Sequence, residues 1–473
     1  MSEAGIAGLG AYAPRLRIAA EEFEKAWGTF EAAGVDTKAV PEGDEDALTM
    51  GVEAAHRALS AAGTDGSQVS HLTFATTTPP IAEADLTARL ASILGTPEDV
   101  QTQTVTGSTR AGAQALATAL AAGPWDDGVG LVIVSDCPRG EPDSAIEHAA
   151  GAGAGALVVD DGAPGVVVET GSHVEPYPGT RFRQSGDDQT SGLGVTQYDR
   201  QAFTTALSGA VDSVGFTPDD VDAVALQSPD GKLPYRATGA LGVDAETIAA
   251  GETVSTLGDT GAASVFLGAA TAFEDGAERV MIAAYGSGAG ATVAVVDGPV
   301  PVNCALAGDT DLTYPEYLRR RGEITSDEPE GGGAYVSVPS WQRTIPQRHR
   351  LVAGECPACG ALNLPPGGAC SGCNTTQEYK QVRLPGTGTV EAVTTIAQGG
   401  APPEFVEQQS RSGPFVSAIV ALDGPGARTV SVPTQVLDSE HDITVGTAVE
   451  TTIRRIYTQE GVTRYGFKAR VVG

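Results

Sequence analysis

Apolar and polar positions follow one pattern over the first 300 residues of the chain and another after residue 380. In the first part, short apolar runs of the kind found in buried strands alternate with longer, alanine-rich runs of helical period. Because strands that alternate with helices are typical of α/β proteins, this part is predicted to contain buried sheets covered by helices. The expected strands include 72–77, 131–135, 154–159, 221–226 and 280–285, and the expected helices 45–62, 84–94, 109–122, 198–214 and 262–275.

After residue 380 the helical period disappears, and short alternating segments follow one another, separated by Gly, Pro and Asp. Five segments of this kind predict a small closed β-barrel. The stretch 325–333, TSDEPEGGG, is rich in Gly, Pro and acidic residues and cannot bury a core, so it is predicted to be a linker. The expected barrel strands are 387–396, 414–423, 429–437, 448–458 and 464–472.

Length and charge narrow the class of protein. A chain of 473 residues exceeds the ~250 to 300 residues over which a single core grows, so two or more domains are expected. The 60 acidic residues outnumber the 29 basic ones, and the net charge of -31 repels polyanions and argues against a nucleic-acid partner. Five of the basic residues are Lys and 24 are Arg, and aromatic residues are few, which indicates adaptation to a cytoplasm of high salt.

Neither a membrane protein nor a disordered chain is expected. The sequence has no run of about 18 apolar residues, and its N-terminus MSEAGIAGLGAY lacks the charged and apolar regions of a secretion signal. With 41% hydrophobic residues, arranged in periodic runs, the chain has enough apolar surface to fold. A cytoplasmic protein without membrane attachment is therefore predicted.

Four of the six cysteines form two CxxC pairs separated by ten residues. Each CxxC turn directs two thiolates at one point, and two such turns complete a tetrahedral S₄ shell that suits Zn²⁺. Since all four vertices are protein ligands, the expected role of the metal is structural, and a redox dithiol pair is the less favoured alternative. Cys137 and Cys304, outside this pattern, are expected to be small buried apolar residues. The predicted metal ligands are Cys356, Cys359, Cys370 and Cys373.

Five further segments follow one another along the chain: GIAGLGAYAPRLRI, DEDALTMGVEAA, SDCPRGEPDSAIEHAAGAGAGAL, SPDGKLP and YGSGAG. Together they resemble archaeal 3-hydroxy-3-methylglutaryl-CoA synthases of the thiolase superfamily. The tail that begins PSWQRTIPQRHRLVAGECPACG resembles the zinc-ribbon and OB-fold proteins that accompany acyl-CoA thiolases and synthases. The resemblance implies an α/β, thiolase-like five-layer αβαβα body of two similar halves, followed by a rubredoxin-type zinc ribbon and an all-β OB-fold barrel.

The same resemblance implies how the chain is divided and what it binds. Residues 1–165 and 166–324 correspond to the two thiolase-like halves, 325–338 to the linker, 339–379 to a helix with the zinc ribbon, and 380–473 to the OB-fold barrel. In the family the body is usually a dimer, and CoA enters a tunnel that leads to a nucleophile at a helix N-terminus. A homodimer with acyl-CoA as its ligand and a structural Zn²⁺ is therefore implied.

Family chemistry uses a cysteine nucleophile, a histidine, an asparagine and a glutamate, and the resemblance implies where each would stand. A threonine hydroxyl ionises far less readily than a thiol, and the sequence shows no base that would help it. Because loss of one such group typically lowers the rate ~10² to 10³-fold, ordinary synthase turnover is not expected. The cysteine position holds Thr109, the histidine position Gln227, the asparagine position Asp259 and the glutamate position Thr77.

Other features of the family pocket are kept. The loop with Gly286, Ser287 and Gly288 lines the acyl pocket in the family, where small residues let backbone N–H groups approach a thioester oxygen; by itself it also suits a strand-ending turn. Lys232 matches a lysine near the CoA phosphates, or is a solvated surface charge. Arg110 stands at the helix N-terminus, where a cation suits a carboxylate or phosphate, or pairs with one of the many acids.

Three functions remain open on the sequence. The favoured one, because several catalytic positions are replaced at once, is a synthase homologue in isoprenoid or lipid metabolism that binds acyl-CoA and docks through its tail to a thiolase, a synthase or another acyl-CoA enzyme. The second is a cysteine-independent enzyme that forms or cleaves a C–C bond in an acyl-CoA, with Asp259 or Tyr285 as the base. The third is an assembly protein whose body binds no ligand.

Overall fold

The computed structural model describes residues 4–123, 128–215, 220–324, 338–397, 405–438, 442–459 and 461–472. The chain separates into two compact units, the first reaching to Tyr317 and the second made mainly of the residues from Leu318 onward. The predicted linker at 325–338 lies outside the described residues, apart from its last residue, Val338. The predicted boundaries between the domains stay predictions.

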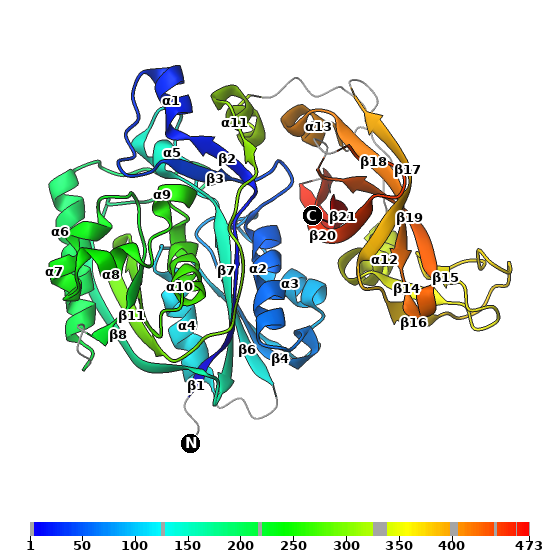
Figure 1. Ribbon diagram of the computed structural model, residues 1–473, viewed down its shortest axis with the longest axis horizontal. Helices are drawn as coiled ribbons and strands as arrows, with labels where there is room; N and C mark the ends of the chain where they lie inside the picture. Colours follow the sequence, from blue (N-terminus) through cyan, green and yellow to red (C-terminus); the bar gives the residue numbers. More distant parts are fainter. Residues whose placement is uncertain are drawn as a thin grey trace. The chain divides into compact units, whose positions relative to one another are not determined.

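A single mixed sheet of ten strands forms the centre of the first unit (Figure 1). Its hydrogen-bonded order is β5-β4-β6-β7-β1-β8-β11-β10-β9, and β12 pairs with β1 in parallel. The two halves of the sheet are joined where β1 pairs with β8 at Gly5 and Ile6. The strands are β1 (Ala4–Tyr12), β4 (Val69–Ala75), β5 (Gln101–Val105), β6 (Val129–Asp136), β7 (Gly153–Asp161), β8 (Gly165–Tyr177), β9 (Ala223–Leu226), β10 (Arg279–Gly286), β11 (Gly288–Asp297) and β12 (Val302–Ala305).

Helices form three layers around and between the two halves of this sheet (Figure 1). The helices α2 (Ala47–Ala61) and α3 (Leu86–Leu94) cover the outer face of the half that contains β4, β6, β7 and β1. The helices α4 (Ala111–Ala122) and α10 (Ser264–Glu274) contact strands of both halves. On the far side, α6 (Thr196–Asp212) covers β8, β10 and β11. The order of layers is αβαβα, which confirms the predicted five-layer, thiolase-like body.

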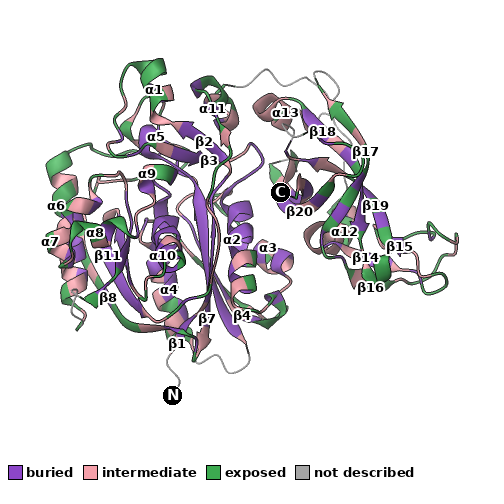
Figure 2. Cartoon of the chain, viewed as in Figure 1, coloured by how far each residue is buried: buried purple, intermediate pink, exposed green. Residues whose placement is uncertain are grey.

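Small side chains let the two central helices lie between the sheet halves. In α4, AGAQALATALAA, a Cβ on Gly112 would come within 2.7 Å of the Ala262 carbonyl oxygen, so this position has no room for a side chain. Helix α10 has a similar composition, SVFLGAATAFE. Apolar atoms packed at this density gain both hydrophobic and dispersion free energy. Figure 2 accordingly shows β7 and α10 mainly buried, whereas much of α6 is exposed.

Local capping explains where α2 begins. The Asp46 side chain accepts hydrogen bonds from the backbone N–H groups of Leu48 and Thr49, and the Thr49 hydroxyl accepts the Asp46 N–H in return. Such a capping box satisfies N–H groups that a helix start leaves unpaired. The remaining elements described before the predicted linker are β2 (Leu16–Ala19), α1 (Ala20–Trp27), β3 (Thr37–Val40), the 3₁₀ turn η1 (Gly66–Gln68), α5 (Ala145–Ala149), the 3₁₀ turn η3 (Pro234–Arg236), α7 (Thr238–Leu241), α8 (Ala245–Ala249), α9 (Val254–Leu257), the 3₁₀ turn η4 (Gly261–Ala263), β13 (Thr310–Asp311) and α11 (Tyr314–Arg321).

The ribbon and the barrel form most of the second unit and share one hydrophobic core. The ribbon is a three-stranded sheet in the order β15-β14-β16, and the barrel closes in the order β17-β18-β19-β21-β20, as the five predicted strands require. Leu351, Leu362 and Leu384, from the segment that carries the ribbon, pack with Val390 and Val420 of the barrel. The elements are α12 (Val338–Arg350), β14 (Val352–Glu355), β15 (Leu362–Asn363), β16 (Lys380–Arg383), β17 (Thr387–Ile396), α13 (Val406–Ser412), β18 (Phe415–Asp423), β19 (Thr429–Val436), β20 (Ala448–Gln459) and β21 (Val462–Val471).

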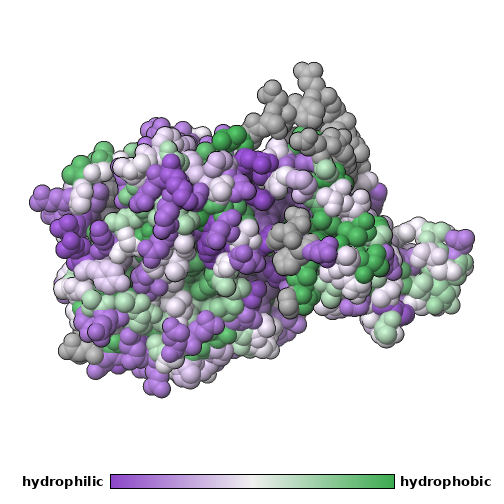
Figure 3. All heavy atoms as spheres, turned by 45° about the horizontal axis from the view of Figure 1, so that its top comes forward, coloured by the Kyte–Doolittle hydropathy of each residue, from purple (hydrophilic) through white to green (hydrophobic). Residues whose placement is uncertain are grey.

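The surface agrees with the acidic composition. Figure 3 shows hydrophilic residues spread over much of one face of the molecule. Among the helices of the described ranges, none is both long enough and apolar enough to cross a membrane. The expected adaptation to high salt and the expected cytoplasmic location stay predictions.

Candidate ligand cavity and metal centre

A cavity of about 430 Å³ lies in the first unit, where the ends of strands meet the starts of helices. Thr109 precedes α4, Gln227 follows β9, Asp259 precedes η4, and Tyr285 belongs to the end of β10. These residues come from separate sequence motifs, and the fold places all four on the wall of one cavity, together with Ser287. Cavities of about 300 to 1,000 Å³ are the usual size of small-molecule sites.

Thr109 is held by a backbone group rather than by a base. Its hydroxyl donates a hydrogen bond of 2.7 Å to the Tyr285 carbonyl oxygen, and the residue is 2% exposed. A hydroxyl becomes a useful nucleophile when a neighbouring base takes its proton, and a carbonyl oxygen is too weakly basic to do so. Thr109 therefore links the start of α4 to β10 and has no activated oxygen.

Gln227 contributes an amide where the family implies an imidazole. The residue is 1% exposed, and its backbone N–H donates to the Ala283 carbonyl oxygen over 3.0 Å. Its side-chain Oε1 is buried and receives no hydrogen bond from any described residue. An amide cannot take up a proton near neutral pH, but it can exchange hydrogen bonds with a ligand. A buried amide oxygen without a donor is costly, so this position favours a ligand in the cavity.

Asp259 is neutralised by a residue that the sequence did not single out. Nη1 of Arg181, a partly exposed residue, forms an ion pair with Oδ2 of the buried Asp259, and the Gly261 N–H donates to Oδ1 over 2.9 Å. With both oxygens engaged, this carboxylate is held in place and is not free to act as a base. Arg181 precedes Asp259 by 78 residues and lies in an irregular segment, so no periodic pattern or motif indicates it.

Tyr285 is placed to donate a proton rather than to accept one. Burial raises the pKa of Tyr285 to about 12, and its hydroxyl donates to Thr180 Oγ1 over 3.3 Å. Thr180 Oγ1 also accepts the Gly288 N–H over 3.3 Å, so this N–H, expected to approach a thioester, is already engaged. A phenol with this pKa stays protonated near neutral pH.

Asp199, in the first turn of α6, also lines the cavity. No described residue donates a hydrogen bond to its buried Oδ1, and burial raises the pKa of Asp199 above the ordinary range of an aspartate. The sequence reasoning missed this residue. A signal was present, because Asp199 precedes the buried Ala202 and Phe203 by three and four positions and so shares their face of the helix.

Thr77 does not line the cavity. Its hydroxyl and its N–H donate to the fully buried Asp136 at the end of β6, over 2.8 and 2.6 Å. Asp136 also accepts hydrogen bonds from Thr76, Thr78 and the Ala262 N–H. The resemblance places a proton-transferring glutamate at this position. In this chain the position holds Thr77, which is hydrogen-bonded to the buried carboxylate of Asp136.

Arg110 and Lys232 are not among the described residues that line the cavity. Arg110 Nη1 donates to the His173 carbonyl oxygen over 3.4 Å, and burial lowers the pKa of Arg110. A Cβ on Gly286 would come within 2.8 Å of the Arg110 Cβ, so this glycine makes room for the arginine. Lys232 is exposed, in a turn whose N–H groups donate to Asp230. Their predicted roles in ligand binding stay predictions.

Neither cysteine of the first unit belongs to the cavity. Of the described residues that line it, none is a cysteine and none is a histidine. Cys137 donates its backbone N–H to Thr78 Oγ1 over 2.9 Å, close to the Asp136 cluster. Cys304 lies in β12, where burial raises the pKa of its thiol to about 12. A displaced thiol–imidazole pair therefore does not replace the family nucleophile in this cavity.

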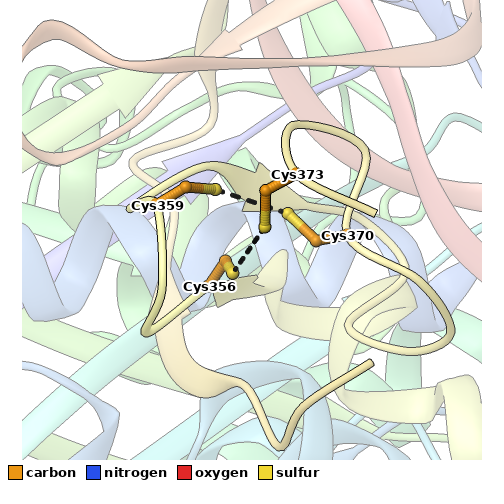
Figure 4. Close-up of side chains that lie close together, drawn as sticks. All are labelled: Cys356, Cys359, Cys370 and Cys373. Atoms are coloured by element: carbon orange, nitrogen blue, oxygen red, sulfur yellow. Dashed lines mark hydrogen bonds between the residues drawn. The ribbon is translucent and has the colours of Figure 1, made fainter. Parts of the chain in front are cut away.

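Four cysteine sulfurs converge in the ribbon (Figure 4). The Sγ atoms of Cys356 and Cys373 are 3.7 Å apart, those of Cys359 and Cys370 are 3.6 Å apart, and all four lie within 4.8 Å of one another. In a tetrahedral centre with Zn–S bonds of about 2.3 Å, neighbouring sulfurs are about 3.8 Å apart. The cluster can hold a metal ion, and its spacing fits Zn²⁺.

Hydrogen bonds to the Cys370 sulfur favour its thiolate form, which binds a metal cation. Burial opposes ionisation of the Cys370 thiol, but backbone N–H groups and the Asn363 amide directed at its sulfur lower the pKa of Cys370 to about 6. Asn363 also accepts the Ser371 N–H over 2.8 Å, which fixes the second CxxC turn against β15. Contacts of this kind orient ligands and favour the thiolate form that binds metal.

Family models match the second unit. Residues 343–377 match a model described as the ChsH2 rubredoxin-like zinc ribbon domain. Residues 381–454 match a model described as the ChsH2 C-terminal OB-fold domain. The predicted ribbon and barrel are thereby confirmed as domain types.

Known proteins also match more than half of this chain. A hydroxymethylglutaryl-CoA synthase of Pyrobaculum aerophilum is 30% identical over 351 residues, which cover 68% of this chain and 99% of the relative. One of Thermococcus gammatolerans is 32% identical over 297 residues, which cover 61% of this chain and 84% of the relative. A solved structure described as MvaS in complex with 3-hydroxy-3-methylglutaryl coenzyme A has a TM-score of 0.60 at 20% identity, covering 71% of this chain and 95% of that one.

Proposed function

The chain belongs to the hydroxymethylglutaryl-CoA synthase family, and we propose that it binds an acyl-CoA in its cavity without forming an acyl-enzyme. The observation that carries the proposal is the hydrogen bond of Thr109, the residue at the position of the family nucleophile. The Thr109 hydroxyl donates its hydrogen to the Tyr285 carbonyl oxygen. Gln227, at the position where the family would have a histidine, has no imidazole that could accept a proton. A cavity of about 430 Å³ with an unpaired buried amide supports a bound ligand over a body that binds nothing.

Acyl-CoA is the proposed ligand class because of the family and its fold. The similar MvaS structure contains 3-hydroxy-3-methylglutaryl coenzyme A. In this proposal the cavity holds the acyl end of the thioester, and Zn²⁺ in the ribbon is structural, since four protein thiolates leave no open position for a substrate. The second unit docks to a thiolase, a synthase or another acyl-CoA enzyme, and the first unit forms a homodimer. Light scattering of the purified chain, alone and with a co-expressed thiolase, tests these last two points.

Binding is expected to stabilise the full-length chain. At a concentration a hundred times the dissociation constant, a ligand adds about 2.7 kcal/mol to the free energy of unfolding. We therefore expect acetyl-CoA, acetoacetyl-CoA or a longer acyl-CoA to raise the melting temperature of the first unit by several degrees. The Ala145→Trp variant, which fills space beside the cavity, is expected to lose this shift, whereas Ala121→Trp, at an exposed site away from the cavity, keeps it.

The same protein is expected to condense acetyl-CoA with acetoacetyl-CoA at least ~10³-fold more slowly than an authentic synthase. Chromatography of the acyl-CoA pool measures the product directly. Formation of 3-hydroxy-3-methylglutaryl-CoA at ordinary rates would overturn the proposal. If no acyl-CoA raises the melting temperature, the alternative of a pure assembly protein is favoured instead.

The alternative of a cysteine-independent enzyme acting on a C–C bond needs a different base from the two expected from the sequence. Asp259 is paired with Arg181, and Tyr285 is a protonated donor near neutral pH. Asp199 is a further carboxylate that lines the cavity, and its buried Oδ1 has no donor among the described residues, so it is the base that this alternative would use.

A further inference from the structure

We propose that Asp199 is a general base that removes a proton from the α carbon of an acyl-CoA held in the cavity. The inference rests on the proposed function, because it requires that the cavity bind an acyl-CoA. It adds a reaction, the reversible formation of a thioester enolate, and assigns it to a residue outside the family positions.

Asp199 differs from the other acidic residues of the cavity in its exposure and its hydrogen bonds. Five carboxylates line it, and two of them, Glu31 and Glu141, are exposed to water. Asp230 accepts two backbone N–H groups in its own turn, and Asp259 is paired with Arg181. Asp199 is half-buried in the first turn of α6, and its buried Oδ1 receives no hydrogen bond from the described residues.

The surroundings of Asp199 make it a stronger base than an ordinary carboxylate. Burial raises the pKa of Asp199, and none of the described residues donates a hydrogen bond to Oδ1 that would stabilise the negative charge. Tyr285 lines the same cavity, and its ring lies 5.1 Å from that of Phe203, one turn after Asp199 in α6. Burial raises the pKa of Tyr285, and the negative charge of Asp199 raises it further. A proton acceptor and a proton donor thus share one cavity.

Gln227 can supply a hydrogen-bond donor for the oxygen of the enolate. Its buried amide lines the same cavity as Asp199, and its Oε1 has no donor among the described residues, so the group is free to turn its NH₂ toward a ligand. A hydrogen bond from this NH₂ to the thioester oxygen would stabilise negative charge that develops there. The Tyr285 hydroxyl donates its one hydrogen to Thr180 Oγ1 over 3.3 Å, so it would reach the ligand as a donor only by exchanging this bond.

The proposed step is balanced without an oxidant or a further reactant. The α C–H bond breaks, its proton forms an O–H bond with Asp199, and the electron pair moves to the thioester oxygen as an enolate. On the return path the enolate carbon takes a proton from Asp199, and the acyl-CoA is restored. In heavy water the Asp199 proton exchanges with solvent, so the α hydrogens are replaced by deuterium.

Deuterium uptake by propionyl-CoA tests this step in the full-length chain. Mass spectrometry of the recovered thioester is expected to show α-deuterium appearing faster with the protein than in buffer alone. Asp199→Asn is expected to lower the protein-dependent rate about 10² to 10⁴-fold, the range typical of general acid–base groups. Asp212→Asn, exposed at the other end of α6, is the matched control and is expected to exchange like the wild type.

The outcomes separate this inference from the proposed function. If propionyl-CoA raises the melting temperature but the wild type exchanges no faster than buffer, the inference is overturned and the proposed function stands. Exchange by Asp199→Asn at the wild-type rate overturns it equally. If no acyl-CoA binds, both fail. Because asparagine has nearly the shape of aspartate and Oδ1 of Asp199 has no donor among the described residues to lose, this variant is expected to fold. Its melting curve with and without propionyl-CoA checks that it still binds.

Discussion

Replacing Cys370 with Ser is expected to abolish metal binding and to unfold the ribbon. The Cys370 sulfur is one of four that converge, it is fully buried, and the Asn363 amide and the Gly372 N–H are directed at it. Structural zinc contributes about 10 to 16 kcal/mol in small zinc modules, and a hydroxyl is a poor replacement for a thiolate ligand. Since the ribbon shares its apolar core with the barrel through Leu362 and Leu384, the loss is expected to destabilise the whole second unit.

Metal analysis and calorimetry measure this effect together. The wild-type chain is expected to carry one Zn²⁺ per chain, and Cys370→Ser none, with the thermal transition of the second unit lost and that of the first retained. Cys304→Ser, outside the cluster, is the matched control and is expected to keep its zinc. A Cys370→Ser chain that holds a full equivalent of zinc and melts like the wild type would contradict the assignment.

Replacing Asp136 with Asn is expected to cost about 3 to 5 kcal/mol in the free energy of unfolding of the first unit. The carboxylate is fully buried and accepts hydrogen bonds from Thr76, Thr77 and the Ala262 N–H. An asparagine of the same shape would direct an NH₂ group at these donors, so at least one of them would lose its partner. Each unsatisfied buried donor costs about 1 to 3 kcal/mol.

Urea unfolding of the first unit, followed with and without acyl-CoA, tests the role of Asp136. Because Asp136 ties the loop after β4 to the turn η4, which follows Asp259, the variant is also expected to bind acyl-CoA more weakly. Asp187→Asn, at an exposed loop position, is the control and is expected to change stability by less than about 0.5 kcal/mol. An unchanged midpoint for Asp136→Asn would show that the cluster does not hold this region together.

Patterns that depend on neighbours in sequence predicted much of the fold. The helix expected at 45–62 begins directly after Asp46. An aspartate followed three residues later by a threonine can form a capping box, which fixes the start of a helix. The five barrel strands follow from alternation between turn residues, and the metal ligands follow from their spacing. Each of these features is encoded in one short segment of the chain, so the sequence alone was enough to place them.

The chemistry of the cavity could not be predicted in the same way. Asp259 is held in an ion pair by Arg181, and Thr77 is hydrogen-bonded to Asp136, in each case a residue of a distant segment. The substitutions at Thr109 and Gln227 were visible in the sequence, but the hydrogen bond from Thr109 to the Tyr285 carbonyl was not, because it joins residues 176 positions apart. Asp199 differs, since its place on the apolar face of α6 could have indicated an acid that is partly withdrawn from water.

Intact-protein mass spectrometry after incubation with acetyl-CoA most directly tests whether this cavity works without a covalent intermediate. We expect the wild-type chain to keep its unmodified mass at saturating acetyl-CoA. The Thr109→Cys chain, with a thiol at the start of α4, is expected to gain one acetyl group and serves as the positive control. An acetyl group on the wild-type chain, mapped to a residue that lines the cavity, would contradict the proposal.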